Sequence, residues 1–395
     1  MIEPFQKARP LLNQIEQAGF EAYFVGGSVR DYLLNRPIED VDIATSALPT
    51  EIKSIFPKTV DVGIEHGTVL VLYGGESYEI TTFRSEGNYE DFRRPKNVTF
   101  IRSLMEDLKR RDFTINAIAM TKEGELIDPF FGQEDLKKQL IRTVGNPKER
   151  FQEDALRMMR AIRFVSQLSF SLEENTAKAV EEHGHLLEHI AVERKLIEFK
   201  KLLNGTNRTE ALRHLVHLQL HRYLPGLNNY AKHILKISTY FNSSQLKGDD
   251  FWILFGITAR LNQLEPLLKQ WKLSNKEIKT IRTVYEAYKE RKKKREWTKE
   301  LIFQFGPEIC IRAEHIFCTV RGGKSFQEGE KIKELYQSLP IKSRTELAVT
   351  GNDLMAWESK KGGSWIKETL ERIERAVIYG EVKNEKQAIK EWLYS

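Results

Sequence analysis

The sequence predicts an α+β protein: an N-terminal α/β head with one small mixed sheet, followed by an elongated all-helical region. Between residue 22 and about residue 130, short β-rich runs alternate with short helical pieces, and Gly, Asp and Pro separate them. From about residue 147 to the end, the apolar residues recur with a helical period almost throughout. With 395 residues, 41% of them hydrophobic, the chain is long enough for two to four domains.

The elements follow in order. Residues 5–18 are expected to form a first helix, and shorter helical pieces are expected at 29–34 and 50–55. The predicted strands are the runs AYFVG, VDIAT, GTVLVLY, SYEITTFR and NAIAM. After IDPFFGQEDLKK the β pattern ends, and only NGTN, LPGLNN and FNSSQLKGDD interrupt the helical pattern. We expect four parts: a head at 1–145, a helical neck at 146–205, a helical body at 206–300 and a helical tail at 301–395.

The charge balance is modestly basic. Lys and Arg number 62 against 56 Asp and Glu, which gives a net charge of +6 and a pI of about 9.0. Such an excess fits a polyanionic partner, although many ordinary enzymes are equally basic. The run KERKKKRE at 289–296 is the densest basic cluster. A solvated helix face explains most such runs, and a phosphate-binding face is the alternative.

The cell compartment can also be predicted. No apolar run is long enough to cross a bilayer, and the N-terminal MIEPFQKARP has no signal-peptide core. Cys310 and Cys318 lie in an apolar, helical-looking stretch and are expected to be buried thiols in a reducing compartment. We therefore expect a soluble cytoplasmic protein.

Two aspartates in the head suggest a metal site. Asp40 and Asp42 flank Val41 in a β-like run, where residues two apart point to the same face. Two carboxylates that close repel each other unless a cation lies between them. Oxygen ligands of this kind suit Mg²⁺, which takes few protein carboxylates and fills its shell with water and phosphate. An exposed pair of strand aspartates is the alternative.

Phosphate-binding residues are expected just upstream. In GGSVRD, Gly26 and Gly27 allow backbone N–H groups to approach a phosphate at the start of a helix, and Arg30 adds a fork of donors. Glu79, in SYEITTFR, could be a third carboxylate that binds metal or takes a proton, or an ordinary surface glutamate. Together these residues predict a phosphoryl-transfer site with two metal ions about 3.5–4 Å apart.

A family resemblance supports this interpretation. GGSVRDYLL followed by EDVDIAT resembles the motif of the nucleotidyltransferase branch that contains tRNA nucleotidyltransferases and bacterial poly(A) polymerases. KRRDFTINAIA, at 109–119, resembles the next motif of that branch. The resemblance implies a nucleotidyltransferase-type head in which Arg111 contacts the triphosphate, Asp112 reads the ribose 2′-hydroxyl and Asn116 braces the site. A surface cluster is the alternative for KRRD by itself.

A helix after the head carries the second informative pattern. RFQEDALRMMRAIRFVSQL, at 150–168, is predicted to be one amphipathic helix. Its apolar stripe is Phe151, Ala155, Met158, Met159, Ile162 and Val165, and its polar side carries Asp154, Arg157, Arg160 and Arg163. A solvated basic face with an ordinary i,i+3 Asp–Arg pair would explain the same pattern.

Base selection is the functional alternative. Cytosine and adenine both present an amino donor beside a ring-nitrogen acceptor, which a carboxylate and a guanidinium can pair with. Guanine and uracil present a carbonyl and an N–H, so both hydrogen bonds would meet the wrong partner. EDALR resembles the EDxxR motif of class II CCA-adding enzymes. This resemblance implies that Asp154 and Arg157 read the base, that Arg160 and Arg163 line the pocket, and that Glu153 anchors the helix or orients Arg157.

Further segments extend the resemblance. GNYEDFRRPKNVTF, at 87–100, is either a surface loop or the flexible loop that this family uses to add the terminal A, and it looks intact. QWKLSNKEI (270–278) and LPIKSRTELAVTGNDLM (339–355) resemble body and tail segments of the bacterial enzymes. By this likeness, the tail would bind the tRNA acceptor stem and elbow through backbone contacts.

The resemblance therefore implies a specific reaction. The tRNA 3′-hydroxyl would attack the α-phosphate of CTP or ATP, pyrophosphate would leave, and C-C-A would be added without a nucleic-acid template. A bacterial poly(A) polymerase, or an enzyme that adds only A or only CC, would carry similar motifs. From a different class, a non-catalytic tRNA-binding module with a vestigial head is the competing hypothesis. We expect a monomer or a homodimer.

Overall fold

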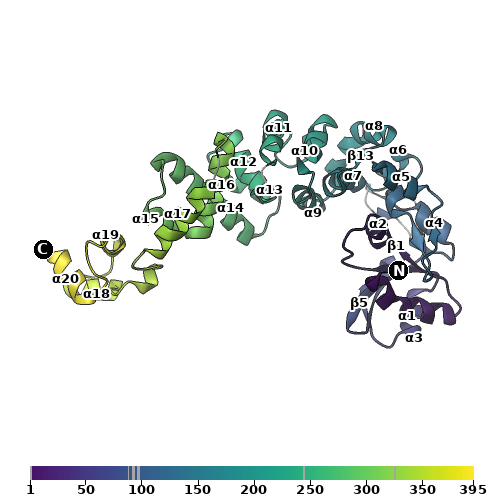
Figure 1. Ribbon diagram of the computed structural model, residues 1–395, viewed down its shortest axis with the longest axis horizontal. Helices are drawn as coiled ribbons and strands as arrows, with labels where there is room; N and C mark the ends of the chain where they lie inside the picture. Colours follow the sequence, from purple (N-terminus) through teal and green to yellow (C-terminus); the bar gives the residue numbers. More distant parts are fainter. Residues whose placement is uncertain (1, 88, 91–93, 96–97, 243–244, 324–325) are drawn as a thin grey trace. The chain divides into compact units, whose positions relative to one another are not determined.

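The computed structural model describes residues 2–395 apart from 88, 91–93, 96–97, 243–244 and 324–325. It consists of two compact units (Figure 1). The first comprises Met1–Ser238 together with Gln270–Lys272, and the second comprises Thr239–Lys269 and Leu273–Ser395. The four-part division expected from the sequence stays a prediction.

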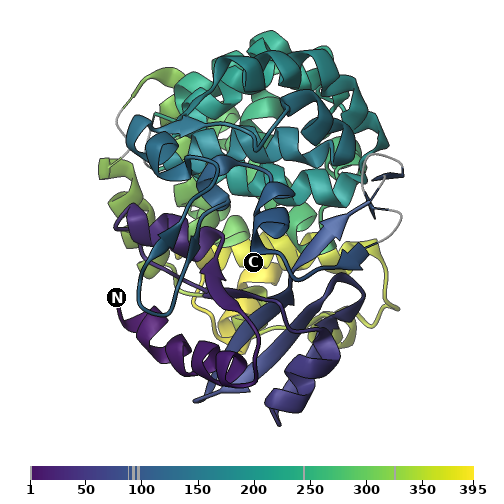
Figure 2. The same cartoon turned by 90° about the vertical axis from the view of Figure 1, so that its right-hand side faces the viewer.

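The first unit contains a mixed sheet, whose strands are drawn in purple and blue in Figure 2. Within the described residues the strand order is β11-β10-β1-β2-β5-β4-β3. The strands are β1 (Ala22–Val25), β2 (Asp42–Thr45), β3 (Thr59–Gly63), β4 (Thr68–Tyr73), β5 (Glu76–Thr82), β10 (Ala119–Met120) and β11 (Leu126–Ile127). β2 and β5 pair in parallel, whereas the other neighbours pair antiparallel.

Among the described residues, three further strand pairs lie outside this sheet. They join β6 (Arg84–Glu86) to β9 (Val98–Phe100), β7 (Tyr89–Glu90) to β8 (Arg94–Pro95), and β12 (Leu140–Ile141) to β13 (Ser171–Leu172). The short 3₁₀ helices are η1 (Ile64–His66), η2 (Thr114–Asn116), η3 (Gly184–His189), η4 (Leu220–Tyr223) and η5 (Arg344–Glu346).

The α-helices run through the whole chain. Up to the end of the first unit they are α1 (Glu3–Gln17), α2 (Gly27–Leu33), α3 (Pro49–Ile55), α4 (Leu104–Lys109), α5 (Gly132–Lys138), α6 (Pro147–Glu153), α7 (Leu156–Leu168), α8 (Glu174–His183), α9 (Val192–Leu203), α10 (Arg208–His217) and α11 (Ala231–Tyr240). They continue as α12 (Asp250–Thr258), α13 (Glu265–Gln270), α14 (Asn275–Lys294), α15 (Lys299–Phe305), α16 (Pro307–Arg321), α17 (Phe326–Gln337), α18 (Gly351–Glu358), α19 (Ser364–Tyr379) and α20 (Lys386–Tyr394). The expected helical region is therefore confirmed.

The predicted strands of the head are present, but NAIAM is shorter than expected, and strands such as β3 and β11 were not predicted. In NAIAM only Ala119–Met120 is a strand, because Thr114–Asn116 forms the turn of η2. β3 was not predicted. It is an edge strand of the sheet, and its Val60 and Val62 face solvent with 45% and 54% of their surface exposed. A strand whose apolar residues point outward lacks the buried alternation that identifies strands.

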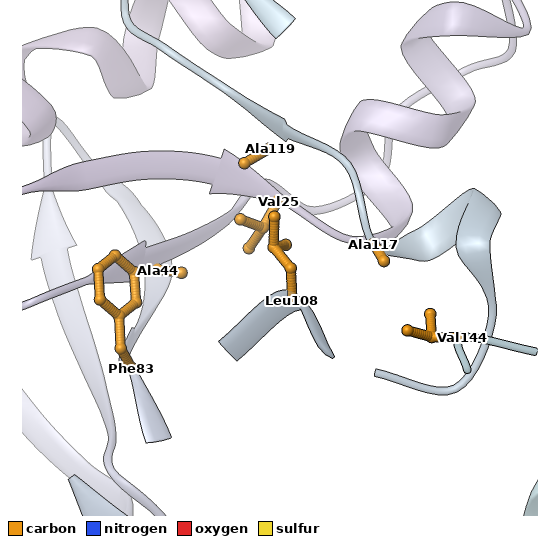
Figure 3. Close-up of a cluster of buried hydrophobic side chains, with 7 residues drawn as sticks. All are labelled: Val25, Ala44, Phe83, Leu108, Ala117, Ala119 and Val144. Carbon is orange, nitrogen blue, oxygen red and sulfur yellow. The ribbon is translucent and has the colours of Figure 1, made fainter. Parts of the chain in front are cut away.

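A buried cluster holds α4 and η2 against the sheet (Figure 3). Its members lie in β1, β2, α4 and β10 and in the segments that follow β5, η2 and β12, and all are buried: Val25, Ala44, Phe83, Leu108, Ala117, Ala119 and Val144. Leu108 is completely buried near the end of α4. Burial of an aliphatic side chain of this size contributes about 1.5–3 kcal/mol. The cluster therefore fixes α4, and with it the Arg110 and Arg111 that follow, over the strand ends.

The short segment Gln270–Lys272 completes the first unit. Trp271 is fully buried there, its ring stacks on Phe199 with a centroid separation of 4.9 Å, and its indole N–H donates to the Pro225 carbonyl at 2.7 Å.

In the second unit, the buried Glu314 of α16 accepts from Arg291 Nε at 2.7 Å and from the Trp297 indole at 2.8 Å. Among the described residues, no helix is both long and apolar enough to span a bilayer.

Candidate active site

A cavity of about 1300 Å³ lies within the first unit. Its walls come from the ends of β1 and β2, from the segment after α4, and from α7 and α9. All but one of the site residues expected from the sequence line it: Gly26, Gly27, Arg30, Asp40, Asp42, Arg111, Asp112, Asn116, Asp154, Arg157, Arg160 and Arg163. The exception is Glu79. Residues from 26 to 163 thus meet around one cavity, as a single site requires.

The glycine turn at one end of the cavity leaves no room for a side chain. Gly26 adopts a φ of +72°, a value that L-residues with a Cβ rarely adopt. A Cβ atom there would lie 3.3 Å from Arg111 Nη1 and 3.3 Å from Asp42 Oδ2. Backbone groups, a guanidinium and a carboxylate therefore converge at this point. Such a convergence suits a phosphate group that is held beside a cation.

Arg30 is oriented by its neighbours. Its Nη1 donates to Asn116 Oδ1 at 2.7 Å, and its Nη2 pairs with Asp31 Oδ2 at 2.8 Å. Asn116 is buried in η2 and also donates from Nδ2 to Asp112 Oδ1 at 3.0 Å. It therefore links the glycine-rich turn to the segment after α4, which agrees with a bracing function.

The two aspartates differ in their surroundings. Asp42 begins β2 and is half-buried, whereas Asp40 is exposed and precedes the strand instead of lying in it as we expected. Val41 between them is buried, so both carboxylates can still face the cavity. Burial first, and then the neighbouring Glu79 charge, raise the pKa of Asp42 to about 6.

Glu79 acts on this site from outside the cavity. It is exposed on β5, and the register that pairs Ile43 with Ile80 brings it beside Asp42 on the neighbouring strand. The expected third carboxylate thus adds negative charge but does not line the cavity. No group of three His, Cys, Asp or Glu among the described residues is arranged to hold a metal by itself. Two carboxylates completed by substrate phosphates are still a sufficient donor set for a hard cation.

Both carboxylate oxygens of Asp112 are held by polar contacts with neighbouring groups. Its Oδ2 lies 2.6 Å from Arg160 Nη2 and accepts from Arg160 Nε at 2.7 Å, while its Oδ1 accepts from the Phe113 backbone N–H at 2.9 Å. Burial alone would raise the pKa of Asp112, but Arg160 and Asn116 hold it below the usual range. The carboxylate therefore stays charged and fixes Arg160.

Asp107 orients the arginines that follow α4, and sequence reasoning missed it. It is 1% exposed, and its two oxygens contact Arg110 at 2.7 Å and Arg111 at 3.2 Å. Burial alone would raise the pKa of Asp107, but these two guanidinium groups hold it below its usual value. The i,i+3 and i,i+4 spacing in EDLKRR was the signal that could have identified it.

The predicted neck helix is interrupted at the residues that were expected to read the base. α6 ends at Glu153, α7 begins at Leu156, and Asp154 between them has an extended backbone with φ −135° and ψ 102°. Its Oδ1 accepts from the Leu156 backbone N–H at 3.0 Å, in the way that aspartate caps a helix. The six predicted apolar residues are all buried. One helix was predicted because this capping aspartate sits within an otherwise continuous apolar period.

Two of the three arginines on the basic side of α7 are buried, which the solvated-face alternative does not explain. Arg157 is 7% exposed and its Nη1 donates to Glu153 Oε2 at 2.6 Å, which agrees with an orienting function for Glu153. Its Nη2 donates to the Arg110 carbonyl at 3.0 Å. Arg163 is 6% exposed and packs on the Phe164 ring with its guanidinium carbon 4.4 Å from the centroid. Burial and then Arg160 lower the pKa of Arg163 to about 10.

Family models match most of the chain. A poly A polymerase head domain matches residues 22–142, a probable RNA and SrmB-binding site of polymerase A matches 169–230, and a putative tRNA nucleotidyltransferase domain 2 matches 245–393. A CCA-adding enzyme of Bacillus cereus (strain AH820) is 51% identical over 393 residues, which cover 99% of this chain and 98% of the relative. The chain belongs to the family of CCA-adding enzymes.

Solved structures of CCA-adding enzymes share the fold. The Bacillus stearothermophilus CCA-adding enzyme in complex with CTP superposes with a TM-score of 0.91 at 45% identity, covering 100% of this chain and 98% of that chain. The Thermotoga maritima CCA-adding enzyme complexed with tRNA gives a TM-score of 0.64 at 24% identity, covering 100% of this chain and 96% of the other, and supports the fold alone. The expected fold class is confirmed.

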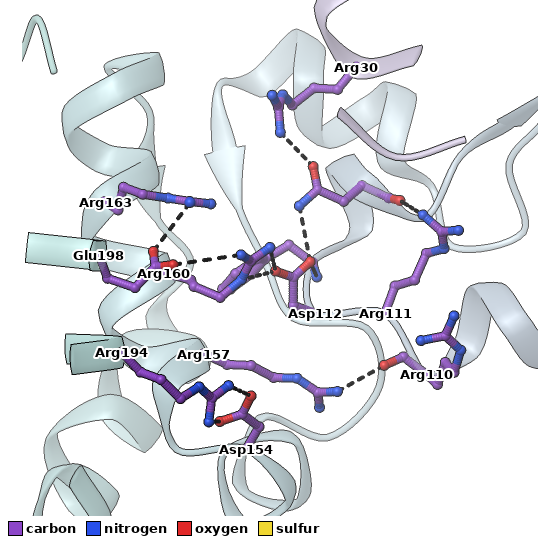
Figure 4. A network of polar contacts seen from close by, with 12 residues as sticks. Arg30, Arg110, Arg111, Asp112, Asp154, Arg157, Arg160, Arg163, Arg194 and Glu198 are labelled. Carbon is purple, nitrogen blue, oxygen red and sulfur yellow. Dashed lines mark hydrogen bonds and ion pairs between the residues drawn. The ribbon is translucent and has the colours of Figure 1, made fainter. Parts of the chain in front are cut away.

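Two charged residues of α9 belong to this site and were missed by sequence reasoning. Arg194 contacts Asp154, and Glu198 contacts Arg163 (Figure 4). Their partners lie 40 and 35 residues earlier in the chain, so no local spacing indicated them.

The loop expected at 87–100 in CCA-adding enzymes cannot be compared in full, because 88, 91–93 and 96–97 lie outside the described residues.

Proposed function

We propose that this protein adds C-C-A to the 3′ end of tRNA from CTP and ATP without a nucleic-acid template. The observation that carries the proposal is the match over the whole chain to CCA-adding enzymes. It is supported by a cavity that is lined by carboxylates, by groups able to donate hydrogen bonds to phosphate, and by an aspartate and arginines suited to a base. In each step, the terminal 3′-hydroxyl attacks the α-phosphate, the bond to the β-phosphate breaks, and pyrophosphate leaves. A cytoplasmic location is part of the proposal, since its substrates are tRNA and nucleoside triphosphates.

The family implies a divalent metal ion, and we propose Mg²⁺ held by Asp40 and Asp42. The raised pKa of Asp42 supports this assignment, because clustered carboxylates in a partly buried site are stabilised by a cation. When bound, such an ion would lower the pKa of the attacking hydroxyl and neutralise phosphate charge. The two-ion arrangement expected from the sequence stays a prediction, and Glu79 contributes charge from the neighbouring strand.

Phosphate binding is assigned to the glycine turn and the arginines. The Gly26–Gly27 backbone can approach the triphosphate closely, since no side chain intervenes. Arg111, oriented by Asp107, and Arg30, oriented by Asn116, would donate to phosphate oxygens. Asp112 is proposed to accept from the ribose 2′-hydroxyl. Its oxygens already accept three hydrogen bonds and form an ion pair with Arg160 Nη2 within the fold, so this contact requires the exchange of one of these partners.

Base selection is assigned to Asp154 and Arg157, with Arg160 and Arg163 lining the same pocket. Asp154 would accept from the amino group of cytosine or adenine, and Arg157 would donate to the ring nitrogen beside it. Uracil and guanine would leave buried groups without a suitable partner, which is the strong form of discrimination. The tail is proposed to bind the acceptor stem and elbow of tRNA by backbone contacts.

The test uses tRNA that lacks its 3′ end, each labelled nucleoside triphosphate in turn, and sequencing of the product ends. Ordered addition of two C and one A is expected. A poly(A) tail would favour the polymerase alternative. The match of residues 22–142 to a poly A polymerase head domain is the observation that supports this alternative. Addition of only A or only CC would show a partial enzyme, and tRNA binding without incorporation would support the non-catalytic module.

Two variants tie the activity to the site. Asp42→Ala should abolish incorporation and leave tRNA binding intact. Asp61→Ala is the matched control, because Asp61 is an exposed aspartate of the same sheet that pairs with Lys53 and does not line the cavity. Arg157→Ala should instead allow UTP incorporation. Unchanged rejection of UTP by this variant would contradict the proposed base selection.

A further inference from the structure

The Asp154 carboxylate is held by a residue from another helix. Arg194 of α9 places Nη2 2.9 Å from Asp154 Oδ2 and Nη1 3.4 Å from Oδ1, a two-point contact (Figure 4). With the Leu156 backbone N–H on Oδ1, three of the four acceptor positions of this carboxylate are taken within the described structure. The remaining position is on Oδ2. A single, directed acceptor is what the recognition of an amino group requires.

The contact matters because Asp154 itself is not in a helix. Its extended backbone lies between α6 and α7, and the hydrogen bond from the Leu156 backbone N–H holds only Oδ1. A parallel pair of N–H···O bonds from one guanidinium fixes both the position and the plane of a carboxylate. Arg194 is 28% exposed at its side chain and lines the same cavity, so it can hold Asp154 while a base is bound.

The rest of α9 matches the charges of α7. Glu198 lies one turn after Arg194, on the same side of the helix, with Oε2 3.2 Å from Arg163 Nη1 and Oε1 4.0 Å from Arg160 Nη1. α9 thus presents a positive group to the acidic residue of the pocket and a negative group to its arginines. This alternation indicates that α9 orients the side chains of the base pocket and does more than support them by packing.

We propose that Arg194 is a positioning residue for nucleotide choice: its two-point contact directs the free acceptor of Asp154 toward the base and so excludes UTP and GTP. The proposal rests on the proposed function, because it concerns the same pocket. Without Arg194, the carboxylate can rotate, and a rotated carboxylate can no longer require an amino group at one position. The loss of Arg194 should therefore weaken discrimination between nucleotides more than it slows the reaction at the phosphate.

The test compares Arg194→Ala, Arg194→Lys and the control Arg213→Ala. Arg213 is 43% exposed at its side chain, pairs with Glu210 on α10 and does not line the cavity. The measurement is kcat/KM for CTP and for UTP on tRNA lacking its 3′ end, with kcat and KM resolved separately. Thermal unfolding of each variant shows whether it is folded.

Arg194→Ala should lower the CTP/UTP ratio of kcat/KM about tenfold or more, mainly through a higher KM for CTP. Arg194→Lys should fall between this variant and the wild type, since one ammonium group cannot hold both oxygens in a plane. Arg213→Ala should behave as the wild type. If Arg194→Ala does not fold, the lysine variant decides, and a reduced ratio supports the proposal.

An Arg194→Ala enzyme that is slower with both nucleotides by the same factor overturns the proposal, because Arg194 would then act only on the structure. An unchanged ratio in a folded lysine variant overturns the two-point contact. Either result leaves the proposed function intact as long as the wild type adds C-C-A in order. A wild type that does not add C-C-A contradicts the proposed function itself, so the two failures are distinguishable.

Discussion

Asp42 Oδ2 lies 3.3 Å from the point where a side chain at Gly26 would begin, and Arg111 Nη1 lies at the same distance from that point. Gly26→Ala should therefore displace a carboxylate and a guanidinium of the active site at once. A displacement of this kind lowers catalytic rates by about 10–100-fold. The measurement is steady-state CTP incorporation into tRNA that lacks its 3′ end.

A matched control separates this steric effect from backbone strain. Gly19 has a φ of +88°, and a Cβ there would meet nothing within 4 Å. Gly19→Ala also places an alanine at a positive φ, at a cost of about 1–2 kcal/mol, without reaching the site. It should be destabilised but active. Equal reductions of activity in both variants would contradict a steric conflict at Gly26.

Removal of the Asp42 charge should stabilise the metal-free protein at neutral pH. Burial and Glu79 raise the pKa of Asp42 from 3.8 to about 6 in the folded state. Above pH 6 the group is charged in both states, and the fold bears the cost of that charge, on the order of 2–3 kcal/mol. Below about pH 4 it is protonated in both states and the cost disappears.

Asp42→Asn should therefore unfold at a higher temperature than the wild type at pH 7–8, and the difference should vanish toward pH 4. Thermal unfolding in the presence of a chelator, at several pH values, measures this. Added Mg²⁺ should stabilise the wild type more than the variant. If the unfolding temperatures of the wild type and the variant depend on pH in the same way, the charge of Asp42 does not destabilise the fold.

Glu314 should be essential to the stability of the second unit. It is 1% exposed and is the acceptor for Arg291, which is itself buried, and for Trp297. Glu314→Leu leaves a buried guanidinium without its counter-charge, at a cost of about 3–5 kcal/mol. Glu286→Leu is the control, because Glu286 is exposed on α14 and its pair with Lys289 contributes at most about 1 kcal/mol. Denaturant unfolding of both variants checks the difference.

The basic run at 289–296 separates into a structural and an exposed part. Arg291 is buried, whereas Lys292, Lys293 and Lys294 are exposed at the end of α14. If these lysines bind tRNA phosphates, their combined replacement by Ala should weaken tRNA binding and reduce its salt dependence. The log–log slope should fall by roughly 1 for each phosphate that is no longer neutralised.

Binding of tRNA at several salt concentrations tests this, and KM for CTP should not change. Lys331 and Lys333 provide a control pair in the same unit, since both are exposed at their side chains and form ion pairs on α17. A triple lysine variant that binds tRNA as the wild type does would identify this surface as a solvated helix face.

Local sequence patterns predicted the head well, because its motifs are contiguous. The glycine turn, the strand that begins at Asp42 and the buried stripe of α7 each depend on residues a few positions apart. Periodicity and turn chemistry are encoded at that range. The roles assigned to these residues in catalysis stay predictions.

What the sequence did not indicate depends on packing between distant segments. Arg194 reaches Asp154 only because α9 packs against α7, and no spacing rule connects residues 40 positions apart. The break at Asp154 was missed for a related reason, since a capping side chain and a helical side chain look alike in a periodic pattern. Glu79 was placed on the correct strand, but its distance from the cavity depends on how β2 and β5 align.

The burial of Trp271 has a practical consequence for dissecting the protein. The described residues that line the cavity all lie between 25 and 201, which suggests a fragment ending at Ser238 as a minimal piece that carries the candidate site. Such a truncation would remove the indole that stacks on Phe199 and leave a void, at a cost of about 3–5 kcal/mol. A chimaera that exchanges the second unit for a foreign one must therefore retain Gln270–Lys272, because the first unit is not encoded by one uninterrupted segment.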